Sequence, residues 1–396
     1  MSHPLISRSW DLQKLQNEGY ELEIKSAFLL VRGVPYVNSR KEVQRGTLVA
    51  KLVLAGDRTT RPDDHVAYFA GEHPCNVDGT EIAQIKHTSG ERTLADGVVI
   101  QHSFSAKPKP SDFYPDYHAK MTTYAAILAG PAQLIDPEAR PQTFRVVEPA
   151  RENRETPFNY IDTASSRAEV DVVMAKLKKL NRIAIAGLGG TGSYVLDFVA
   201  KTPVWEIHLY DGDIYLQHNA FRSPGAPSLA ELEAQTPKAT WFKDLYSKMH
   251  SGIVDHPVYL EERNVEELRG MDFVFVCVDS GESKRLIVEK LEEFGVPFID
   301  VGMGVQLNDE MLAGIVRVTT STASKRDHFR QRVSFEDLSN NEYNRNIQIA
   351  DLNGLNAAMA VVKWKKLLGF YRDMKSEHHT QFHIDTNGIV NEDRPQ

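Results

Sequence analysis

The stretch RIAIAGLGGTGSYVLDFVAK, residues 182–201, constrains the fold of this chain more than any other feature. It begins with a short apolar run, continues through a glycine-dense turn and ends with apolar residues at helical spacing. Glycines let a backbone turn sharply and approach a ligand closely, and the first amide groups of a helix favour bound anions. The pattern predicts a strand, a phosphate-binding turn and a helix that begins near Ser193. A glycine loop that only packs helix against strand is the alternative.

Short β-branched or aromatic runs recur after this point, with helical stretches between the first two and between the later ones. They are RIAIAG, EIHLYD, HPVYLEERN, DFVFVCVD and VPFIDVG, at residues 182–187, 206–211, 256–264, 272–279 and 296–302. Such alternation predicts an α/β fold with a doubly wound, mostly parallel sheet. Ligands bind beyond the carboxyl ends of such strands, so the residues that follow the first, second and fourth runs should meet in one crevice.

Residues 1–150 follow a different pattern. A helix is expected near residues 11–17, and the runs AFLLVRGVPYV, GTLVAKLVLAG and DGVVIQHSF resemble strands separated by turns. The segment DYHAKMTTYAAILAG places Met121, Tyr124 and Leu128 on one helix face. Residues 135–157 are rich in Pro, Glu and Arg without apolar periodicity, which is typical of a linker. We therefore expect a smaller α+β domain at 1–150 and a Rossmann-like domain at 151–396.

The bulk composition excludes several classes of protein. A net charge of −8 at pH 7 disfavours a nucleic-acid or anionic-membrane partner, since such surfaces require clustered Lys and Arg. No stretch approaches 18 apolar residues, and the N-terminus lacks the pattern of a secretory signal, so a cytoplasmic protein is expected. Two cysteines, Cys75 and Cys277, cannot form a disulfide framework or a four-cysteine zinc site.

The chemistry-bearing residues lie in and after the glycine turn. The turn fits G-x-G-x-x-G and is extended by one glycine and closed by a serine: Gly187, Gly189, Gly190, Gly192 and Ser193. This pattern alone does not separate NAD from ATP. A second cluster follows the next strand and continues further along the chain: Asp211, Asp213, Asn219, Arg222, Lys238 and Asp279.

The second cluster favours ATP chemistry. Hydride transfer has no need for an arginine at this place, whereas attack on the α-phosphate of ATP builds negative charge that cations such as Arg222 and Lys238 can neutralise. A carboxylate at Asp211 can accept hydrogen bonds from ribose hydroxyls with either cofactor. Asp279 offers Mg²⁺ the hard oxygen ligand that this ion prefers.

These motifs resemble those of the ubiquitin-activating-enzyme superfamily, in particular its bacterial ThiF/MoeB-type adenylyltransferases, over residues 180–370. The shared set is GLGGTGS, then D-x-D with Asn and Arg at +8 and +11 from the first Asp, then a Lys, then an Asp after the fourth strand. The resemblance implies that Asp211 holds the ribose, Arg222 and Lys238 the ATP phosphates, and Asp279 the Mg²⁺. It assigns Asn219 to the network beside the nucleotide.

The resemblance also implies a substrate and partners. In that family the C-terminal carboxylate of a ubiquitin-like protein attacks ATP, which yields an acyl-adenylate and pyrophosphate, and the acyl group then passes to a conjugating partner. Residues 1–150 are similar to an uncharacterised domain that precedes adenylating domains in bacterial ubiquitin-like conjugation operons, some of them near phage-defence genes. The similar segments are VRGVPYV and HSFSAKPKPSDFYPDYHAKMTTYA. We expect this domain to dock the ubiquitin-like protein or the conjugating partner.

The acceptor of the acyl group stays open at this stage. Segment 321–346, where relatives often carry a catalytic cysteine, contains none. Cys277 lies in an apolar strand run and is expected to be inert. The remaining options are Cys75, a thiol of a partner protein, or a hydroxyl in this segment: Ser321, Thr322 or Ser324. Hydroxyls are weak nucleophiles without an activating base.

Further expectations concern assembly and alternative functions. Other relatives insert an arginine from a neighbouring protomer, so Arg167 and a homodimer are candidates. The group His378, His379 and His383 matches no regular metal site, and a solvated terminal segment is the expectation. The rival functions are an NAD-dependent oxidoreductase, which leaves Arg222 unexplained, and a catalytically silent scaffold that binds a ubiquitin-like protein.

Overall fold

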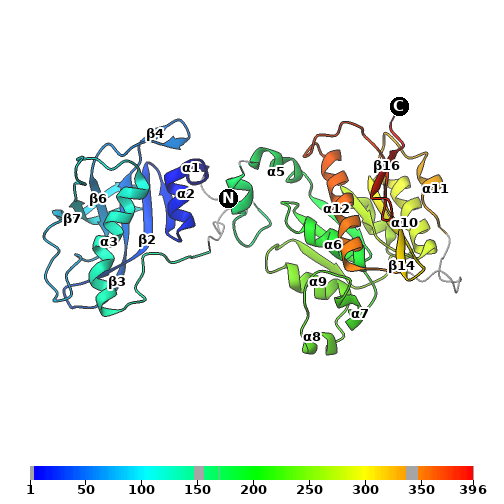
Figure 1. Cartoon of the computed structure of the whole chain (residues 1–396), viewed down its shortest axis with the longest axis horizontal. Helices are drawn as coiled ribbons and strands as arrows, with labels where there is room; N and C mark the ends of the chain where they lie inside the picture. The colour runs from blue at the N-terminus through cyan, green and yellow to red at the C-terminus, as the bar shows by residue number, and fades with distance from the viewer. Residues whose placement is uncertain (1–3, 147–155, 169, 336–346, 396) are drawn as a thin grey trace. The chain divides into compact units, whose positions relative to one another are not determined.

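The computed structural model describes residues 4–146, 156–168, 170–335 and 347–395. The chain divides into two compact units, Met1–Glu148 with Tyr160–Val170, and Pro149–Asn159 with Asp171–Gln396. Figure 1 shows the elements of both units and labels many of the helices and strands.

The first unit is built on an antiparallel sheet of six strands in the order β1-β2-β3-β6-β8-β7. A separate two-stranded sheet joins β4 and β5. The elements of this unit are α1 (Pro4–Arg8), α2 (Trp10–Asn17), β1 (Glu21–Lys25), β2 (Phe28–Val37), β3 (Val43–Lys51), β4 (Leu54–Ala55), β5 (Arg58–Thr59), β6 (Val66–Ala70), β7 (Lys86–Ala95), β8 (Val98–Ser105), α3 (Tyr117–Ile135) and α4 (Thr163–Arg167). The expected α+β character is confirmed.

Helix α3 covers one face of this sheet (Figure 1). Met121, Tyr124 and Leu128 are fully buried, as their spacing predicted. The side chain of Asp116 begins the helix by accepting a hydrogen bond from the backbone N–H of Ala119. Tyr117 ties the helix to the sheet, because its hydroxyl donates to the Lys51 carbonyl at 2.7 Å.

The outer strand of the sheet, β7, is exposed over its first eight residues. Its pairing with β8 is interrupted at three places, between Lys86 and Thr88, Ser89 and Arg92, and Thr93 and Ala95.

The segment after α3 differs from the expected linker. Gln142 donates a hydrogen bond from Nε2 to the Tyr20 hydroxyl at 3.0 Å, and the Phe144 N–H donates to the Gly19 carbonyl at 3.0 Å. These contacts fix residues 142–144 against the turn between α2 and β1, so a linker over all of residues 135–157 is wrong. Residues 147–155 lie outside the described part of the chain.

The second unit contains an eight-stranded sheet in the order β11-β10-β9-β12-β13-β14-β15-β16. The five neighbouring strands β11, β10, β9, β12 and β13 pair in parallel. The pairs β13–β14, β14–β15 and β15–β16 are antiparallel. The elements are α5 (Asp171–Leu177), β9 (Arg182–Ala186), α6 (Gly190–Val199), β10 (Glu206–Tyr210), α7 (Gln217–Ala220), α8 (Leu229–Glu233), α9 (Lys238–Tyr246), β11 (Ile253–His256), η1 (Val265–Gly270), β12 (Phe273–Val276), α10 (Gly281–Phe294), β13 (Phe298–Asn308), β14 (Met311–Ser321), α11 (Phe329–Arg332), α12 (Ala350–Leu367), β15 (His379–His383) and β16 (Gly388–Glu392).

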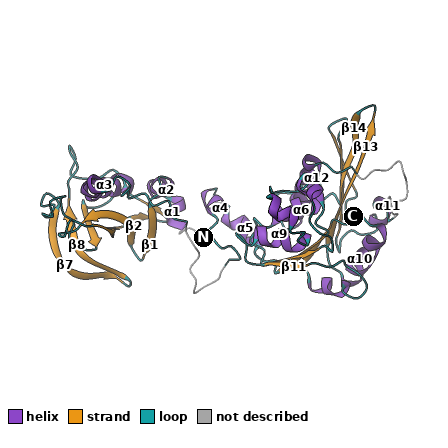
Figure 2. Cartoon of the chain, turned by 90° about the horizontal axis from the view of Figure 1, so that it is seen from below, coloured by secondary structure: helices purple, strands orange, loops and turns teal. Residues whose placement is uncertain are grey.

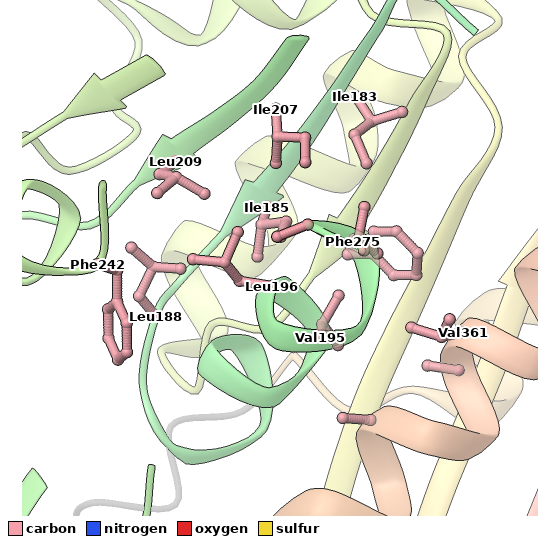
Figure 3. Close-up of a cluster of buried hydrophobic side chains, with 14 of the residues drawn as sticks. Ile183, Ile185, Leu188, Val195, Leu196, Ile207, Leu209, Phe242, Phe275 and Val361 are labelled. Carbon is pink, nitrogen blue, oxygen red and sulfur yellow. The ribbon is translucent and has the colours of Figure 1, made fainter. Parts of the chain in front are cut away.

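Strand β9 is buried on both faces, as central strands of parallel sheets are. Ile183 and Ile185 face the core that contains α6 and α12, whereas Ala184 and Ala186 face the core that contains α10. Figure 2 shows these helices on opposite sides of the sheet, and Figure 3 shows Ile183 and Ile185 among side chains of the first core. The predicted doubly wound, mostly parallel sheet is confirmed.

One predicted strand is wrong. Residues 256–264 were expected to form a strand, but β11 spans Ile253–His256 and ends there. Pro257 follows, and a proline has no N–H with which to continue the ladder. Among the described residues, no helix is long and apolar enough to cross a membrane.

Candidate active site

The strand order brings the glycine turn to the middle of the sheet. Strand β9 lies between β10 and β12, so the chain leaves it at the point where the connections change direction, which is where such sheets bind ligands. Gly187 has φ +89°, and a Cβ on it would lie 2.8 Å from the Cys277 carbonyl oxygen at the end of β12. Only glycine fits at this position, where the turn after β9 passes close to the backbone at the end of β12.

The other glycines of the turn have different roles. A Cβ on Gly192 would lie 1.9 Å from the Gly187 carbonyl oxygen, so this position is required for packing. A Cβ on Gly189 would meet nothing within 4 Å. Gly189 is the N-cap of α6 and supplies no side-chain cap, which leaves an open helix N-terminus where an anion can approach the backbone amides.

The start of α6 corrects the prediction. The helix begins at Gly190 and not near Ser193. Ser193 is fully buried, and its hydroxyl donates to the Gly190 carbonyl at 2.7 Å. Its side chain therefore braces the first turn.

Asp211 connects the glycine turn to β10. One carboxylate oxygen accepts a hydrogen bond from the Leu188 N–H at 2.6 Å, and the other accepts from the Asp213 N–H at 2.9 Å. The residue is 8% exposed. Burial raises the pKa of this carboxyl, while Lys238 and the two backbone donors oppose that rise.

Lys238 lies against both carboxylates as the first residue of α9. Its Nζ is 2.5 Å from Asp213 Oδ2 and 3.8 Å from Asp211 Oδ1, and the residue is 4% exposed. The Tyr259 hydroxyl also donates to Asp213. Burial acts to raise the pKa of Asp213, but the hydrogen bonds from Lys238 and Tyr259 outweigh it, so the pKa is lowered and the carboxylate stays charged.

Asn219 and Arg222 lie in and after the short helix α7. The Asn219 side chain is buried and accepts a hydrogen bond from the Leu216 N–H at 2.8 Å, so it holds its own turn. Burial lowers the pKa of the neighbouring His218, and the positive charges of Arg222 and Lys238 lower it further. The two cations thus act on the same small region. Among the described residues, the buried Nε of Arg222 has no hydrogen-bond partner, which leaves a donor for a ligand.

Asp279 is exposed in the turn between β12 and α10. This turn follows the carboxyl end of the strand next to β9, as the sequence predicted. Within the described residues, no three His, Cys, Asp or Glu side chains form a metal cluster. A single carboxylate of this kind suits Mg²⁺, which is commonly held by one or two carboxylates together with substrate phosphates.

Two residues near the candidate site, Tyr259 and Asn353, were not found from the sequence. The ring of Tyr259 packs on Gly212, where a Cβ would lie 2.6 Å from it. Asn353 of α12 is fully buried and reaches the first turn of α6. In the sequence, Asn353 and Asn356 stand out only as two asparagines on a helix face that is largely apolar.

The three candidate acceptor hydroxyls are not brought to the glycine turn. Ser321 pairs with Phe298 at the beginning of β13, and so lies toward the opposite edge of the sheet from the carboxyl ends. Thr322 follows it and forms hydrogen bonds with Ser324 Oγ at 2.9 Å and His378 Nε2 at 3.0 Å.

The expected solvation of the histidine group is wrong for two of its members. His378 and His379 are 3% and 0% exposed. Strand β15 pairs with β14, which buries His379 beside Thr319 at a ring-to-hydroxyl distance of 3.0 Å.

Neither thiol is activated. Burial raises the pKa of Cys75, and the nearby Glu81 and Asp78 raise it further. Burial also raises the pKa of Cys277, as expected for an inert strand cysteine. A thiolate is the reactive form, so both groups are poor nucleophiles in this state. The side chain of Arg167 lies outside the described part of the chain.

Comparison with known proteins decides the family. The model of the ThiF family matches residues 162–385. The chain belongs to the ThiF family. Residues 10–163 match a domain of unknown function, DUF6791. No curated protein sequence matches the chain.

Solved structures with a similar fold include Escherichia coli MccB with a MccA derivative, at 18% identity, TM-score 0.46, and coverage of 57% of this chain and 68% of MccB. MccB with ATP gives 17% identity, TM-score 0.46, and coverage of 59% and 72%. PaaA gives 16% identity, TM-score 0.42, and coverage of 57% and 76%. At these values the family assignment rests on the sequence match. Membership of the ThiF family supports ATP-dependent adenylation of a carboxylate.

Proposed function

We propose that this protein adenylates the C-terminal carboxylate of a ubiquitin-like protein with ATP and Mg²⁺. The observation that carries the proposal is the pair of cations, Arg222 and Lys238, linked to an open helix N-terminus. Lys238 contacts Asp211, which binds the Leu188 amide of the glycine turn. The Arg222 carbonyl is joined through Asn353 to Thr191 in the first turn of α6.

The roles follow from charge and position. The uncapped N-terminus of α6 offers its first backbone amides to the phosphates, Arg222 offers its unpartnered Nε, and Lys238 adds a second positive charge. Asp211 accepts the ribose hydroxyls, and Asn219 keeps the Arg222 turn in place.

Mg²⁺ supplies charge neutralisation on the phosphates, and Asp279 is the residue that would hold it. The chemistry consists of placing two anions in line and screening their charge, so no general base is required. The carboxylate oxygen forms a bond to the α-phosphorus, and pyrophosphate leaves.

The acyl acceptor is assigned to a conjugating partner rather than to this chain. Burial disfavours the thiolates of Cys75 and Cys277. Ser321 lies toward the amino end of β13 in the sheet register. These observations favour a partner thiol among the options that the sequence left open. A homodimer stays a prediction, to be tested by sedimentation.

For the N-terminal unit we propose a docking role. A cavity of about 320 Å³ lies between α1, β5 and the start of α3. Arg8, Arg58 and Arg61 line it together with hydroxyl groups, two carboxylates (Asp11 and Asp116) and Trp10, which is 66% exposed. Arginine and tryptophan are the residues that most often anchor protein partners. Changing Arg58 and Arg61 to Glu should weaken binding of the ubiquitin-like or conjugating partner.

The test of adenylation is exchange of labelled pyrophosphate into ATP, with a small ubiquitin-like protein as substrate. Asp279→Ala should abolish exchange by removing the metal ligand, and Arg222→Ala should depress it in a folded protein. Arg269→Ala removes an exposed arginine that pairs with Glu266 and serves as the control. Full exchange in the Asp279 or Arg222 variant would contradict the assignment.

The same experiment separates the rival functions. An NAD-dependent oxidoreductase would bind nicotinamide dinucleotide in calorimetry and catalyse no exchange. A silent scaffold would bind the ubiquitin-like protein without forming an adenylate. Intact-mass analysis after incubation with ATP and Mg²⁺ distinguishes an adenylate from a thioester or an ester.

A further inference from the structure

Helix α12 reaches the glycine turn through one buried side chain. Asn353 lies in the first turns of α12 and is 0% exposed. Its Oδ1 accepts a hydrogen bond from the Thr191 hydroxyl at 3.1 Å. Its Nδ2 donates to the Arg222 carbonyl at 3.1 Å. One amide therefore bonds to both segments that carry the phosphate-binding groups.

Gly190 provides the space for this amide. A Cβ on Gly190 would lie 2.0 Å from Asn353 Nδ2 and 2.4 Å from Asn353 Cγ. In contrast, a Cβ on Gly189 would meet open space. The glycine at position 190 is thus required by the asparagine, whereas position 189 faces the open end of the helix.

We propose that Asn353 is a positioning residue that sets the distance between the α6 N-terminus and the Arg222 loop. An amide is suited to this role because it offers an acceptor and a donor at once. Thr191 supplies a donor and the Arg222 carbonyl an acceptor, so each bond uses a different end of the same group. The inference rests on the proposed function, since both segments are assigned to the triphosphate.

The position of Arg222 relative to the helix amides matters most in the transition state. Charge on the phosphates rises as pyrophosphate departs, and a shift of about 1 Å in a positioning group can lower the rate by about 100-fold. Loss of Asn353 should therefore lower kcat more than it raises KM for ATP.

A matched control lies one turn further along the same helix. Asn356 is also 0% exposed, and its Nδ2 donates to the Gly302 carbonyl at 3.0 Å, on β13 and away from the glycine turn. Asn356→Ala removes the same chemical group from the same depth. Comparison of the two variants separates positioning from general loss of packing.

The experiment measures pyrophosphate exchange and urea unfolding for Asn353→Ala, Asn353→Asp and Asn356→Ala. We expect kcat to fall about 10- to 100-fold in both Asn353 variants, with KM for ATP changed less than about threefold. Asn353→Asp keeps the acceptor for Thr191 but replaces the Nδ2 donor with a carboxylate oxygen. Because the side chain keeps its size, this variant tests the hydrogen bond to the Arg222 carbonyl. Asn356→Ala should keep kcat within about threefold. Equal losses of kcat at Asn353 and Asn356 would overturn the proposal.

A rescue tests the contact with Gly190. Gly190→Ala alone should lower kcat, because its methyl group displaces the Asn353 amide. The double variant Gly190→Ala, Asn353→Ala should be no worse than either single variant, because the methyl group enters the vacated space. Strictly additive losses would show that Gly190 serves another purpose.

Amide hydrogen exchange separates this proposal from the proposed function. Asn353→Ala should increase exchange in residues 188–193 and 219–224 together, and Asn356→Ala should not. If the wild-type protein catalyses no pyrophosphate exchange, the proposed function fails, and this hydrogen-exchange pattern still decides whether Asn353 couples the two segments. Unchanged protection in both segments would refute the coupling.

Discussion

Replacing Lys238 by Met should destabilise the second unit by about 3 kcal/mol at neutral pH. The Lys238 side chain is 6% exposed, and its Nζ lies 2.5 Å from Asp213 and 3.8 Å from Asp211. Methionine fills similar space but leaves the buried Asp211 without its cation. Removing one partner of a buried pair costs about 3–5 kcal/mol. We take the lower end of this range because the Asp213 side chain is 50% exposed and solvent screens its charge.

Urea unfolding followed by tryptophan fluorescence measures this loss, and its pH dependence tests the cause. Burial raises the pKa of Asp211 in the folded protein, and loss of Lys238 should raise it further. A carboxyl with a raised folded pKa binds its proton more tightly in the folded state, so the destabilisation should shrink as pH falls from 7 towards about 4. Adding Asp213→Asn should recover part of the loss. A change below about 1 kcal/mol, or one that grows in acid, would refute the electrostatic reasoning.

Three further predictions concern the glycine turn, a thiol and a buried histidine. Gly192→Ala should lower the free energy of unfolding in urea by more than about 2 kcal/mol, because its Cβ would lie 1.9 Å from the Gly187 carbonyl oxygen. Gly189→Ala should stay folded, since its Cβ would meet nothing within 4 Å, and should bind ATP more weakly in calorimetry. Cys75→Ser should leave pyrophosphate exchange unchanged. Wild-type Cys75 should react slowly with iodoacetamide at pH 8, because burial raises the pKa of its thiol. Rapid labelling of the folded protein would contradict this. Burial and nearby Arg317 lower the pKa of His379 to about 4, so the folded state excludes a proton that the unfolded chain binds near pH 6.5. Stability should therefore fall between pH 6.5 and 4, and an unchanged slope in His379→Gln would show that this group is not the cause.

Local patterns in the sequence predicted much of the fold. The strand at residues 182–186, the helix after it and the buried face of α3 all follow from apolar periodicity, because those segments bury the faces that the periodicity marks. The failure at residues 256–264 has a local cause as well. The run is apolar enough for a strand, but Pro257 cannot continue the hydrogen-bonded ladder.

The contacts that hold the site together could not be predicted, because they join distant parts of the chain. Asn353 and Thr191 are 162 positions apart and meet only because α12 packs against α6. Nothing in the apolar face of α12 distinguishes Asn353 from Asn356, yet only the first reaches the glycine turn.

The histidines at the end of the chain show the same limit. A run of polar residues predicts solvent exposure, but the pairing of β15 with β14 places His379 in a buried layer. Strand pairing between distant segments is a property of the sheet, and the short polar sequence around His379 carries no signal for it.

The edge strand β7 affects how this protein behaves when many copies share a solution. Its exposed residues include Lys86, Glu91 and Arg92, and its ladder to β8 is broken at three places. A strand from another molecule would meet charged side chains on a strand whose regular pairing is interrupted, and both features disfavour the addition of a further strand at this edge. The N-terminal units should therefore resist zipping together into aggregates even at high concentration.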